Sequence, residues 1–213
     1  HEALISYAKK YGIPAIGTSD HGNIFGSVKF FQACKKAGIK PILGMEAYFT
    51  EDVAIKEQHN KYYHLLLIVQ NRVGYKNLCK LISGSYQKGF YFKPRIDYAM
   101  LGTYNEGLIV TTACYGGHIP TLLMRGDEEE ARRRINWFLD VFGRDRFYLE
   151  VQPDEQPEQK VLNEKLYTIS ESHNIKCVVG CDAHYPSLED HDAHEIMLAI
   201  QTHAKMADDD RFT

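Results

Sequence analysis

The chain has 213 residues, of which 44% are hydrophobic. This length and composition are enough for one domain with its own core, so a second domain is not needed. Its 25 basic and 28 acidic side chains give a formal charge of −3, which excludes a broad basic surface for nucleic acid. Five cysteines without CxxC spacing argue against a disulfide framework. We find no signal peptide or membrane-spanning run, and we expect a cytoplasmic protein without a membrane partner.

Helical and strand-like patterns alternate along the chain. The apolar strands are nearly continuous, which predicts a parallel sheet covered by helices on both faces, either an open sheet or a closed barrel. Ligand-type residues follow many successive strands, and this favours the barrel, whose rim gathers the strand ends around one centre. Helices are predicted at 2–11, 25–37, 72–87, 127–142, 158–173 and 189–203, and strands at 14–18, 41–48, 63–69, 107–112, 146–151 and 177–181.

The first three predicted strands carry metal-ligand side chains. Asp20 and His21 follow the first strand directly, Glu46 lies within the second, and His64 stands near the start of the third. A carboxylate in an apolar strand is seldom buried alone, so we expect Glu46 to meet a cation. Taken singly, His64 could be a hydrogen-bonded core residue and Asp20 a helix cap.

Aromatic and cationic residues alternate in the segment 89–95. Phe90, Tyr91 and Phe92 precede Lys93 and Arg95, a composition suited to stacking bases and holding phosphates. The alternative is an aromatic loop packed on the barrel.

The later strands carry the same kinds of residue. Cys114 follows the fourth strand, although a free cysteine is often a small core residue. Asp182 and His184 follow the sixth, and in extended backbone residues i and i+2 point the same way, so both could hold one ion. His, Asp, Glu and thiolate are ligands of zinc, manganese and iron. Glu150 could support such ligands from outside.

Two further histidines, His191 and His194, are spaced i, i+3 on the last predicted helix. They follow acidic residues on what reads as a polar helix face. We interpret them as solvated or as neighbours of the ligands, and not as ligands themselves.

Together these motifs resemble the PHP (polymerase and histidinol phosphatase) domain, in the branch found at the N-terminus of bacterial DNA polymerase III alpha subunits. The resemblance runs along nearly the whole chain. Its lysine-proline-arginine loop and the closing Gln201-Thr202 belong to the polymerase branch. It rests on residues 15–23, 37–46, 63–65, 89–95, 107–114 and 182–185.

The resemblance implies a single PHP domain over residues 1–213, folded as a distorted (β/α)₇ TIM-like barrel. Its rim is expected to bind Zn²⁺ or Mn²⁺, up to a trinuclear cluster. The family also has an N-terminal strand with a His-x-His motif, so we expect that strand and three ligands to be absent here, and the chain to end near the polymerase palm. With this incomplete ligand set, the isolated fragment is expected to be a poor exonuclease. The ligands implied are His21, Glu46, His64, Cys114, Asp182 and His184.

The implied function is a metal-dependent phosphodiesterase, a 3′–5′ exonuclease for proofreading within a DNA-directed DNA polymerase of a bacterial or phage cytoplasm. Expected partners are DNA 3′ ends, the palm and thumb of the same parent chain, and a proofreading subunit. Lys93 and Arg95 would hold the DNA phosphates. A metal-poor structural module and a histidinol-phosphatase-type phosphomonoesterase are the alternatives, opposed by the six ligands and by the polymerase-type loop. The implied catalytic residues are His21, Glu46, Asp182 and His184.

Overall fold

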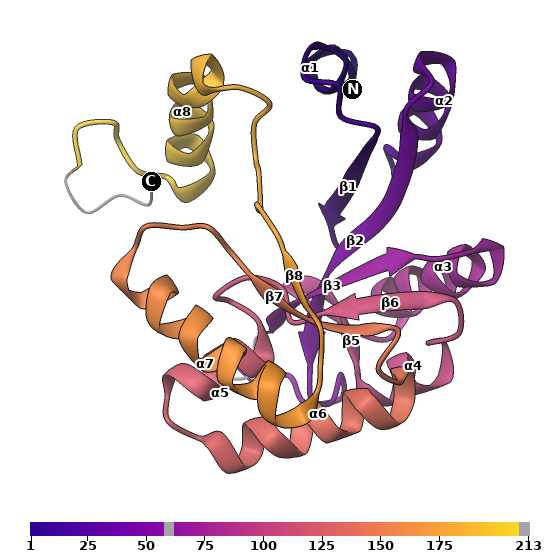
Figure 1. The fold of residues 1–213 in the computed structure, drawn as a ribbon, viewed down its shortest axis with the longest axis vertical. Coiled ribbons are helices and arrows are strands. Elements are labelled where there is room, and N and C mark those ends of the chain that lie inside the picture. The colour runs from indigo at the N-terminus through magenta and orange to yellow at the C-terminus, as the bar shows by residue number, and fades with distance from the viewer. Residues whose placement is uncertain (58–61, 209–213) are drawn as a thin grey trace.

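A computed structural model describes residues 1–57 and 62–208, and their eight strands form one mixed sheet (Figure 1). The strand order is β4-β5-β2-β3-β6-β7-β8, and β1 pairs with β2 beside this path. The sheet curls into a half-barrel surrounded by helices, so the predicted distorted TIM-like barrel is confirmed. The strands are β1 (Ala15–His21), β2 (Lys40–Thr50), β3 (Tyr63–Val69), β4 (Phe90–Tyr91), β5 (Lys93–Asp97), β6 (Leu108–Thr111), β7 (Phe147–Val151) and β8 (Cys177–Val179).

The helices begin and end at sequence signals. Asn71 and Asp97 accept hydrogen bonds from the first backbone N–H groups of α3 and α4, and Gly38 ends α2 in the left-handed conformation. All six predicted helices are present, the last as η1 followed by α8. The helices are α1 (Glu2–Lys10), α2 (Ser27–Ala37), α3 (Arg72–Gln87), α4 (Tyr98–Thr103), α5 (His118–Met124), α6 (Glu128–Phe142), α7 (Pro157–His173), η1 (Leu188–Asp190) and α8 (His191–Thr202).

Strand direction departs from the prediction at β3, which runs antiparallel to both of its neighbours, β2 and β6. A parallel pair needs a long crossover, usually a helix. The connection 51–62 shows no helix in its described residues, 51–57 and 62, and β3 therefore returns beside β2 in the opposite direction. The other long pairings, β1–β2, β2–β5, β6–β7 and β7–β8, are parallel as predicted.

Three elements escaped the sequence interpretation. The helices α4 and α5 are too short to show helical periodicity, and the segment 89–95, predicted as a loop, forms the tight antiparallel hairpin β4–β5. This hairpin extends the sheet beyond β2 and lies beside the functional site described below.

Strand β2 is the centre of the fold. Both β1 and β5 pair along one of its edges, β1 over residues 40–46 and β5 over 48–50, while β3 takes the other edge. Alternate residues of β2 point to opposite faces. Phe49 enters the apolar core with Phe138 and Phe147, whose rings stack with centroids 5.2 Å apart. Glu46 and Tyr48 belong to the opposite face.

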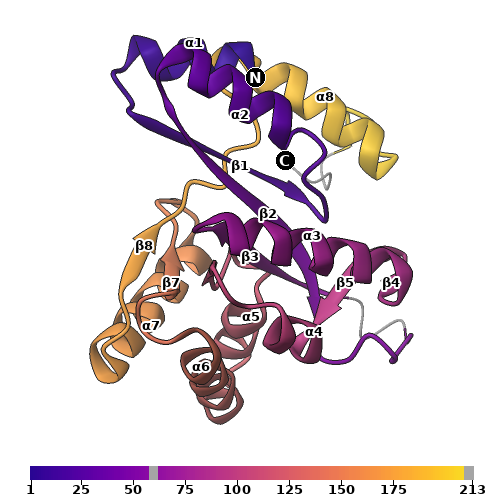
Figure 2. The same cartoon turned by 90° about the vertical axis from the view of Figure 1, so that its right-hand side faces the viewer.

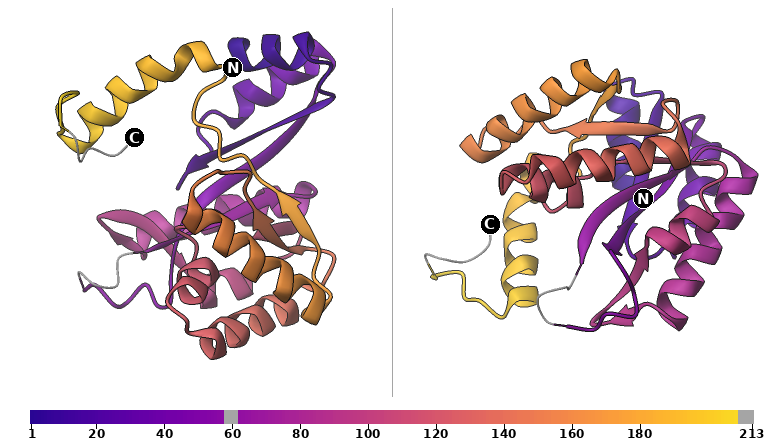
Figure 3. Two further views of the ribbon diagram at one scale, coloured as in Figure 1. Left: turned by 60° about the vertical axis from the view of Figure 1, so that its left-hand side comes forward. Right: turned by 90° about the horizontal axis from the view of Figure 1, so that it is seen from below.

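The views in Figures 2 and 3 separate two groups of elements. The helices α1, α2 and α8 gather with β1 at one end, and α3 to α7 pack around the rest of the sheet. Among the described residues, no helix is both long and apolar enough to cross a membrane.

Candidate metal centre

Three ligand-type side chains from three adjacent strands converge on one point. His21 ends β1 and is in register with Glu46 of β2, while His64 of β3 is in register with Tyr48, two residues along. One nitrogen or oxygen atom from each of His21, Glu46 and His64 lies within 4.8 Å of the others. The Glu46 carboxylate is 2.7 Å from His64 Nδ1 and 3.7 Å from His21 Nδ1. Asp20 is exposed and does not cap α2.

Cys114 joins this group through the turn after β6. Its Sγ lies 3.4 Å from His64 Nδ1 and 4.0 Å from Glu46 Oε1. Ala113 adopts a positive φ of 58°, which turns the chain toward β3. The turn is fixed to β3 because the His64 N–H donates to the Gly116 carbonyl at 2.9 Å, and a Cβ on Gly116 would lie 3.3 Å from the His64 ring.

Asp182 and His184 approach from the other end of the sheet. Strand β8 ends at Val179 and Asp182 has a φ of +46°, so the extended geometry assumed for this pair is wrong. The two are brought together by a turn instead: His184 Nδ1 lies 2.8 Å from the Asp182 carbonyl and 3.8 Å from Asp182 Oδ1. That contact leaves the Nε2 of His184 free to act as a ligand.

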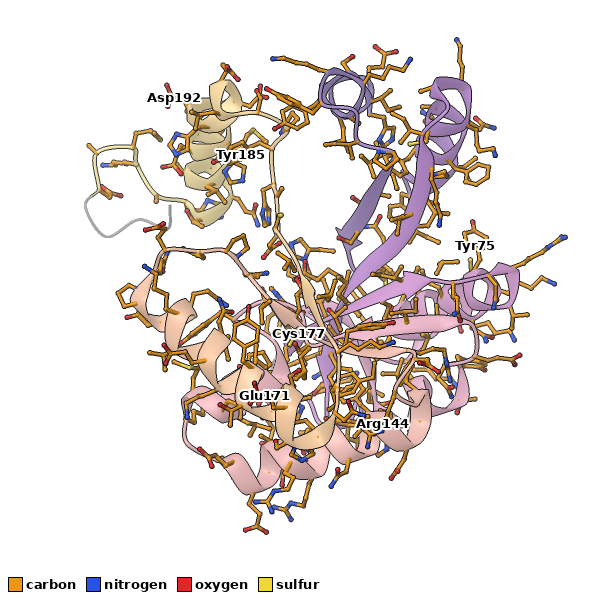
Figure 4. The ribbon with its side chains drawn as sticks, in the orientation of Figure 1. Tyr75, Arg144, Glu171, Cys177, Tyr185 and Asp192 are labelled. Atoms are coloured by element: carbon orange, nitrogen blue, oxygen red, sulfur yellow. The ribbon has the colours of Figure 1, made fainter. Side chains whose placement is uncertain are left out.

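The His184 ring lies 6.2 Å from that of His21, so this turn borders the three-strand group without joining its close set. Tyr185, on the segment between β8 and α8 (Figure 4), stands 5.0 Å from the His194 ring. His194 is also 5.7 Å from His184. Of the two predicted roles for His194, neighbour of a ligand fits its position.

The electrostatics of the group show what it is built to hold. Burial acts to raise the pKa of Glu46, but the hydrogen bond and charge of His64, with the charges of His21 and His184, lower it. Hydrogen bonds to Cys114 and to Glu46 raise the pKa of His64 to about 10, against the effect of burial. His64 Nδ1 therefore lies between the carboxylate and the sulfur, at a position that favours positive charge.

A metal ion fits this space. The converging donors are two imidazoles, a carboxylate and a thiol, a set typical of zinc, and the carboxylates also suit manganese. An ion of charge +2 would replace the His64 proton as the partner of Glu46, which links metal binding to proton release.

Comparison with known proteins places the chain in a family. The profile of the PHP domain matches residues 1–154. The chain belongs to the PHP domain family. It is 44% identical to the DNA polymerase III alpha subunits of Borreliella burgdorferi and Aquifex aeolicus over 98% and 94% of its length. It spans 18% of the length of each of these relatives.

A solved structure shows the same fold. The crystal structure of a protein assigned as a metal-dependent phosphoesterase from Bifidobacterium adolescentis superposes with a TM-score of 0.54. The match covers 87% of this chain and 82% of the other, at 14% identity. It therefore supports the TIM-like PHP architecture of the chain.

Glu150 of the PHP domain lies beneath the Asp182 turn. It is buried, accepts a hydrogen bond from Thr111 Oγ1 at 2.5 Å, and faces Gly180, where a Cβ would stand 2.0 Å from its Oε1. Burial raises the pKa of Glu150, and the nearby charges of Asp182 and Glu46 act in the same direction. This position fits the predicted supporting carboxylate.

The two cations of the β4–β5 hairpin have different surroundings. Lys93 Nζ lies 5.4 Å from the centroid of the Tyr48 ring, which stacks on His21 at 5.9 Å and an interplanar angle of 16°. The Tyr48 ring therefore lies between the Lys93 ammonium group and His21 of the candidate metal centre.

Arg95 does not fit the predicted contact with DNA. It is 0% exposed, and its guanidinium donates to the carbonyls of Gly89, Ile55 and Val53, each at 3.1 Å. The prediction is corrected: Arg95 ties the hairpin to the segment after β2, because a guanidinium enclosed by carbonyls is not presented to solvent.

Two tyrosines of the centre were missed by the sequence interpretation. Tyr48 packs edge-on against Tyr62 at 4.8 Å, and Tyr62 stacks on His64 at 6.2 Å. The signal was present for Tyr48, which follows Glu46 by two residues on one strand and so shares its face. These rings limit the orientations of His21 and His64.

Proposed function

We propose that this PHP domain is a metal-dependent phosphodiesterase acting on DNA 3′ ends, as a 3′–5′ exonuclease within a DNA polymerase III alpha subunit. The observation that carries the proposal is the convergence of His21, Glu46, His64 and Cys114 at the rim of a phosphoesterase-like fold. The similarity to alpha subunits over nearly the whole chain supports the polymerase context.

Each residue of the centre has a defined task in this proposal. His21, Glu46, His64 and Cys114 would hold zinc or manganese, and Asp182 and His184 would complete the coordination from the β8 side. When bound, such ions supply a Lewis acid for the phosphate and lower the pKa of a water molecule.

The remaining residues act around that centre. Lys93 would balance the charge of the phosphate next to the scissile one. Glu150, held by Thr111, would fix the position of the Asp182 turn. The Tyr48 and Tyr62 rings would keep the histidines oriented and restrict water around them.

We further propose that residues 1–213 act as one domain, with the polymerase palm and thumb of the same parent chain and a proofreading subunit as its partners. A structural module without catalysis remains the principal alternative. Six ligand-type side chains favour a catalytic role: donor atoms of His21, Glu46 and His64 lie within 4.8 Å of one another, and the Cys114 sulfur contacts two of these residues.

The test is hydrolysis of a 5′-labelled single-stranded oligonucleotide by the alpha subunit that contains this domain, loaded with Mn²⁺ or Zn²⁺. We expect stepwise shortening from the 3′ end, lost in Glu46→Gln and retained in Glu51→Gln, a carboxylate of the same strand region that contacts Arg134 instead of the centre. Metal-loaded protein that leaves 3′ ends intact would favour the structural module, and release of phosphate from histidinol phosphate would favour the phosphomonoesterase.

A further inference from the structure

Two phenylalanines next to the metal centre are unusually exposed. Phe25, in the loop after β1, is 79% exposed, and Phe92, at the tip of the β4–β5 hairpin, is 66% exposed. Single exposed apolar residues are common on protein surfaces. These two differ because the backbone around each of them is held in place, and because both belong to loops that border the same site.

The hairpin presents Phe92 in a constrained conformation. Tyr91 pairs with Lys93 across the tip, leaving Phe92 alone in the turn with a φ of 58°, which is rare for a bulky side chain. The buried guanidinium of Arg95 supports this turn by hydrogen bonding to Gly89 and by lying 5.1 Å from the Tyr91 ring centroid. Phe92 thus has a strained backbone conformation although most of its side chain is exposed to solvent.

The loop that carries Phe25 is braced in a similar way. Asn23 donates from its side chain to the His21 carbonyl at 3.0 Å and accepts from the Phe25 N–H at 2.9 Å. This ties Phe25 directly to the metal-ligand residue at the end of β1.

The two loops touch each other beside the centre. A Cβ on Gly22, which has a φ of +68°, would stand 3.0 Å from Pro94 Cγ and 3.0 Å from the Tyr48 ring. The loop after β1 therefore packs against the hairpin base, and Figure 2 shows both on the same side of the molecule. Lys93, over Tyr48, provides a positive charge between the hairpin tip and the centre.

We propose that Phe25 and Phe92 form a stacking platform for the unpaired bases at the 3′ end of single-stranded DNA. The proposal rests on the proposed function for the identity of its ligand. Exposed aromatic rings beside a cation are the combination by which proteins bind single strands without reading sequence. In a duplex, by contrast, the terminal bases are paired and stacked on each other, so the platform would select frayed or mismatched ends.

The charges favour DNA over a protein partner as the occupant. Lys93 on one edge attracts phosphate groups, and the proposed metal centre on the other edge would do so when loaded.

The experiment is the binding of a fluorescent oligothymidylate, followed by anisotropy in EDTA so that hydrolysis plays no part. Phe92→Ala and Phe25→Ala are each expected to weaken binding by about 10-fold, the size associated with losing one base–aromatic stack. Phe92→Tyr, which keeps an aromatic ring at this position, should bind as tightly as wild type. Phe31→Ala removes another exposed phenylalanine, on α2, and should leave binding unchanged. Melting temperatures equal to wild type would show that the variants are folded.

The outcomes separate this inference from the proposed function. Unchanged binding in both Ala variants, or an equal loss in Phe31→Ala, would overturn the platform even if metal-loaded protein degrades DNA. Loss of binding in the Phe variants together with no hydrolysis by metal-loaded wild type would support the platform and contradict the exonuclease. A matching second readout is the ratio of single-strand to blunt-duplex binding, which should fall toward one in the Phe92→Ala variant.

Discussion

The two faces of the central strands hold two histidines in opposite states. On the open face His64 contacts Glu46 and Cys114, and the hydrogen bonds to these groups raise its pKa to about 10. On the helix-covered face His118 is buried, stacked on Tyr63 with centroids 4.2 Å apart, and burial with the charges of Arg134 and Arg125 lowers its pKa to about 4.

The difference shows how neighbouring groups decide the chemistry of one residue type. His64 is surrounded by acceptors and attracts a positive charge, which a metal ion can supply. The His118 Nδ1 lies 2.9 Å from Tyr98 Oη, and burial raises the pKa of Tyr98, which keeps that hydroxyl protonated. The Nε2 lies 3.6 Å from Glu51 Oε1. The open face favours an added positive charge, whereas on the covered face burial and the nearby arginines disfavour a second positive charge on His118.

The largest effect is expected from removing the charge of the open face. Glu46→Gln should weaken zinc or manganese binding by at least ~100-fold, since even supporting groups outside the ligands are worth 10- to 100-fold. Glu51→Gln, on the covered side, is the matched control and should leave affinity unchanged. Isothermal titration with Zn²⁺ measures both. Equal affinity in the two variants would show that Glu46 is not a ligand.

The buried His118 of the covered face should make the free energy of unfolding depend on pH. His118 has a folded pKa near 4 against its usual 6.5, so the unfolded state binds more protons between these values. The stability that His118 contributes as a neutral ring is present above pH 6.5 and is lost as the pH falls toward 4. The difference between the folded pKa of His118 and its usual pKa corresponds to about 3 kcal/mol of unfolding free energy.

His118→Gln, which cannot titrate, should remove that part of the acid dependence. Urea unfolding of wild type and variant at pH 7, 5.5 and 4.5 measures it. Parallel stability curves for the two proteins would mean that His118 is already free to protonate in the folded state.

Much of this arrangement could be read from the sequence, because it depends on local patterns. The six predicted strands and the six predicted helices appear within a few residues of their expected bounds. Glu46 has histidine neighbours that can carry the positive charge a carboxylate in an apolar strand requires. The ligand-type residues that follow different strands meet because those strands are neighbours in the sheet.

What could not be predicted depends on chain direction and on turns. The antiparallel β3 follows from a connection whose path no periodicity reveals, and the meeting of Asp182 with His184 depends on a left-handed residue and not on an extended strand. The composition of the hairpin predicted two DNA-binding cations, but burial of one of them is a tertiary property. Lys93 and Arg95 are therefore equivalent candidates in the sequence, but in the fold Arg95 is buried and Lys93 is not.

The support beneath the Asp182 turn offers a test of intermediate size. Gly180→Ala places a Cβ against the Glu150 carboxylate and should cost about 1–3 kcal/mol while also weakening metal binding through the displaced turn. Gly102→Ala is the control, since a Cβ there meets its nearest atom at 3.7 Å. Adding Glu150→Ser to Gly180→Ala should recover part of the loss in thermal unfolding, and an additive double variant would exclude the contact.

The smallest effect separates the two hairpin cations. Lys93→Gln should leave stability unchanged and reduce the salt dependence of DNA binding by about one counterion. Arg95→Gln should lower the stability, since it removes the donors of the Gly89, Ile55 and Val53 carbonyls. Anisotropy titrations at several salt concentrations, paired with thermal unfolding, measure both variants. A DNA defect in Arg95→Gln at full stability would restore the original prediction for that residue.

The most direct test of the metal centre is anomalous diffraction at the zinc edge from crystals grown with Zn²⁺. We expect an anomalous peak about 2.0–2.3 Å from the donor atoms of His21, Glu46, His64 and Cys114. On zinc binding, the His64–Glu46 hydrogen bond of 2.7 Å should be replaced by coordination. Zinc bound elsewhere, with that hydrogen bond intact, would contradict this expectation.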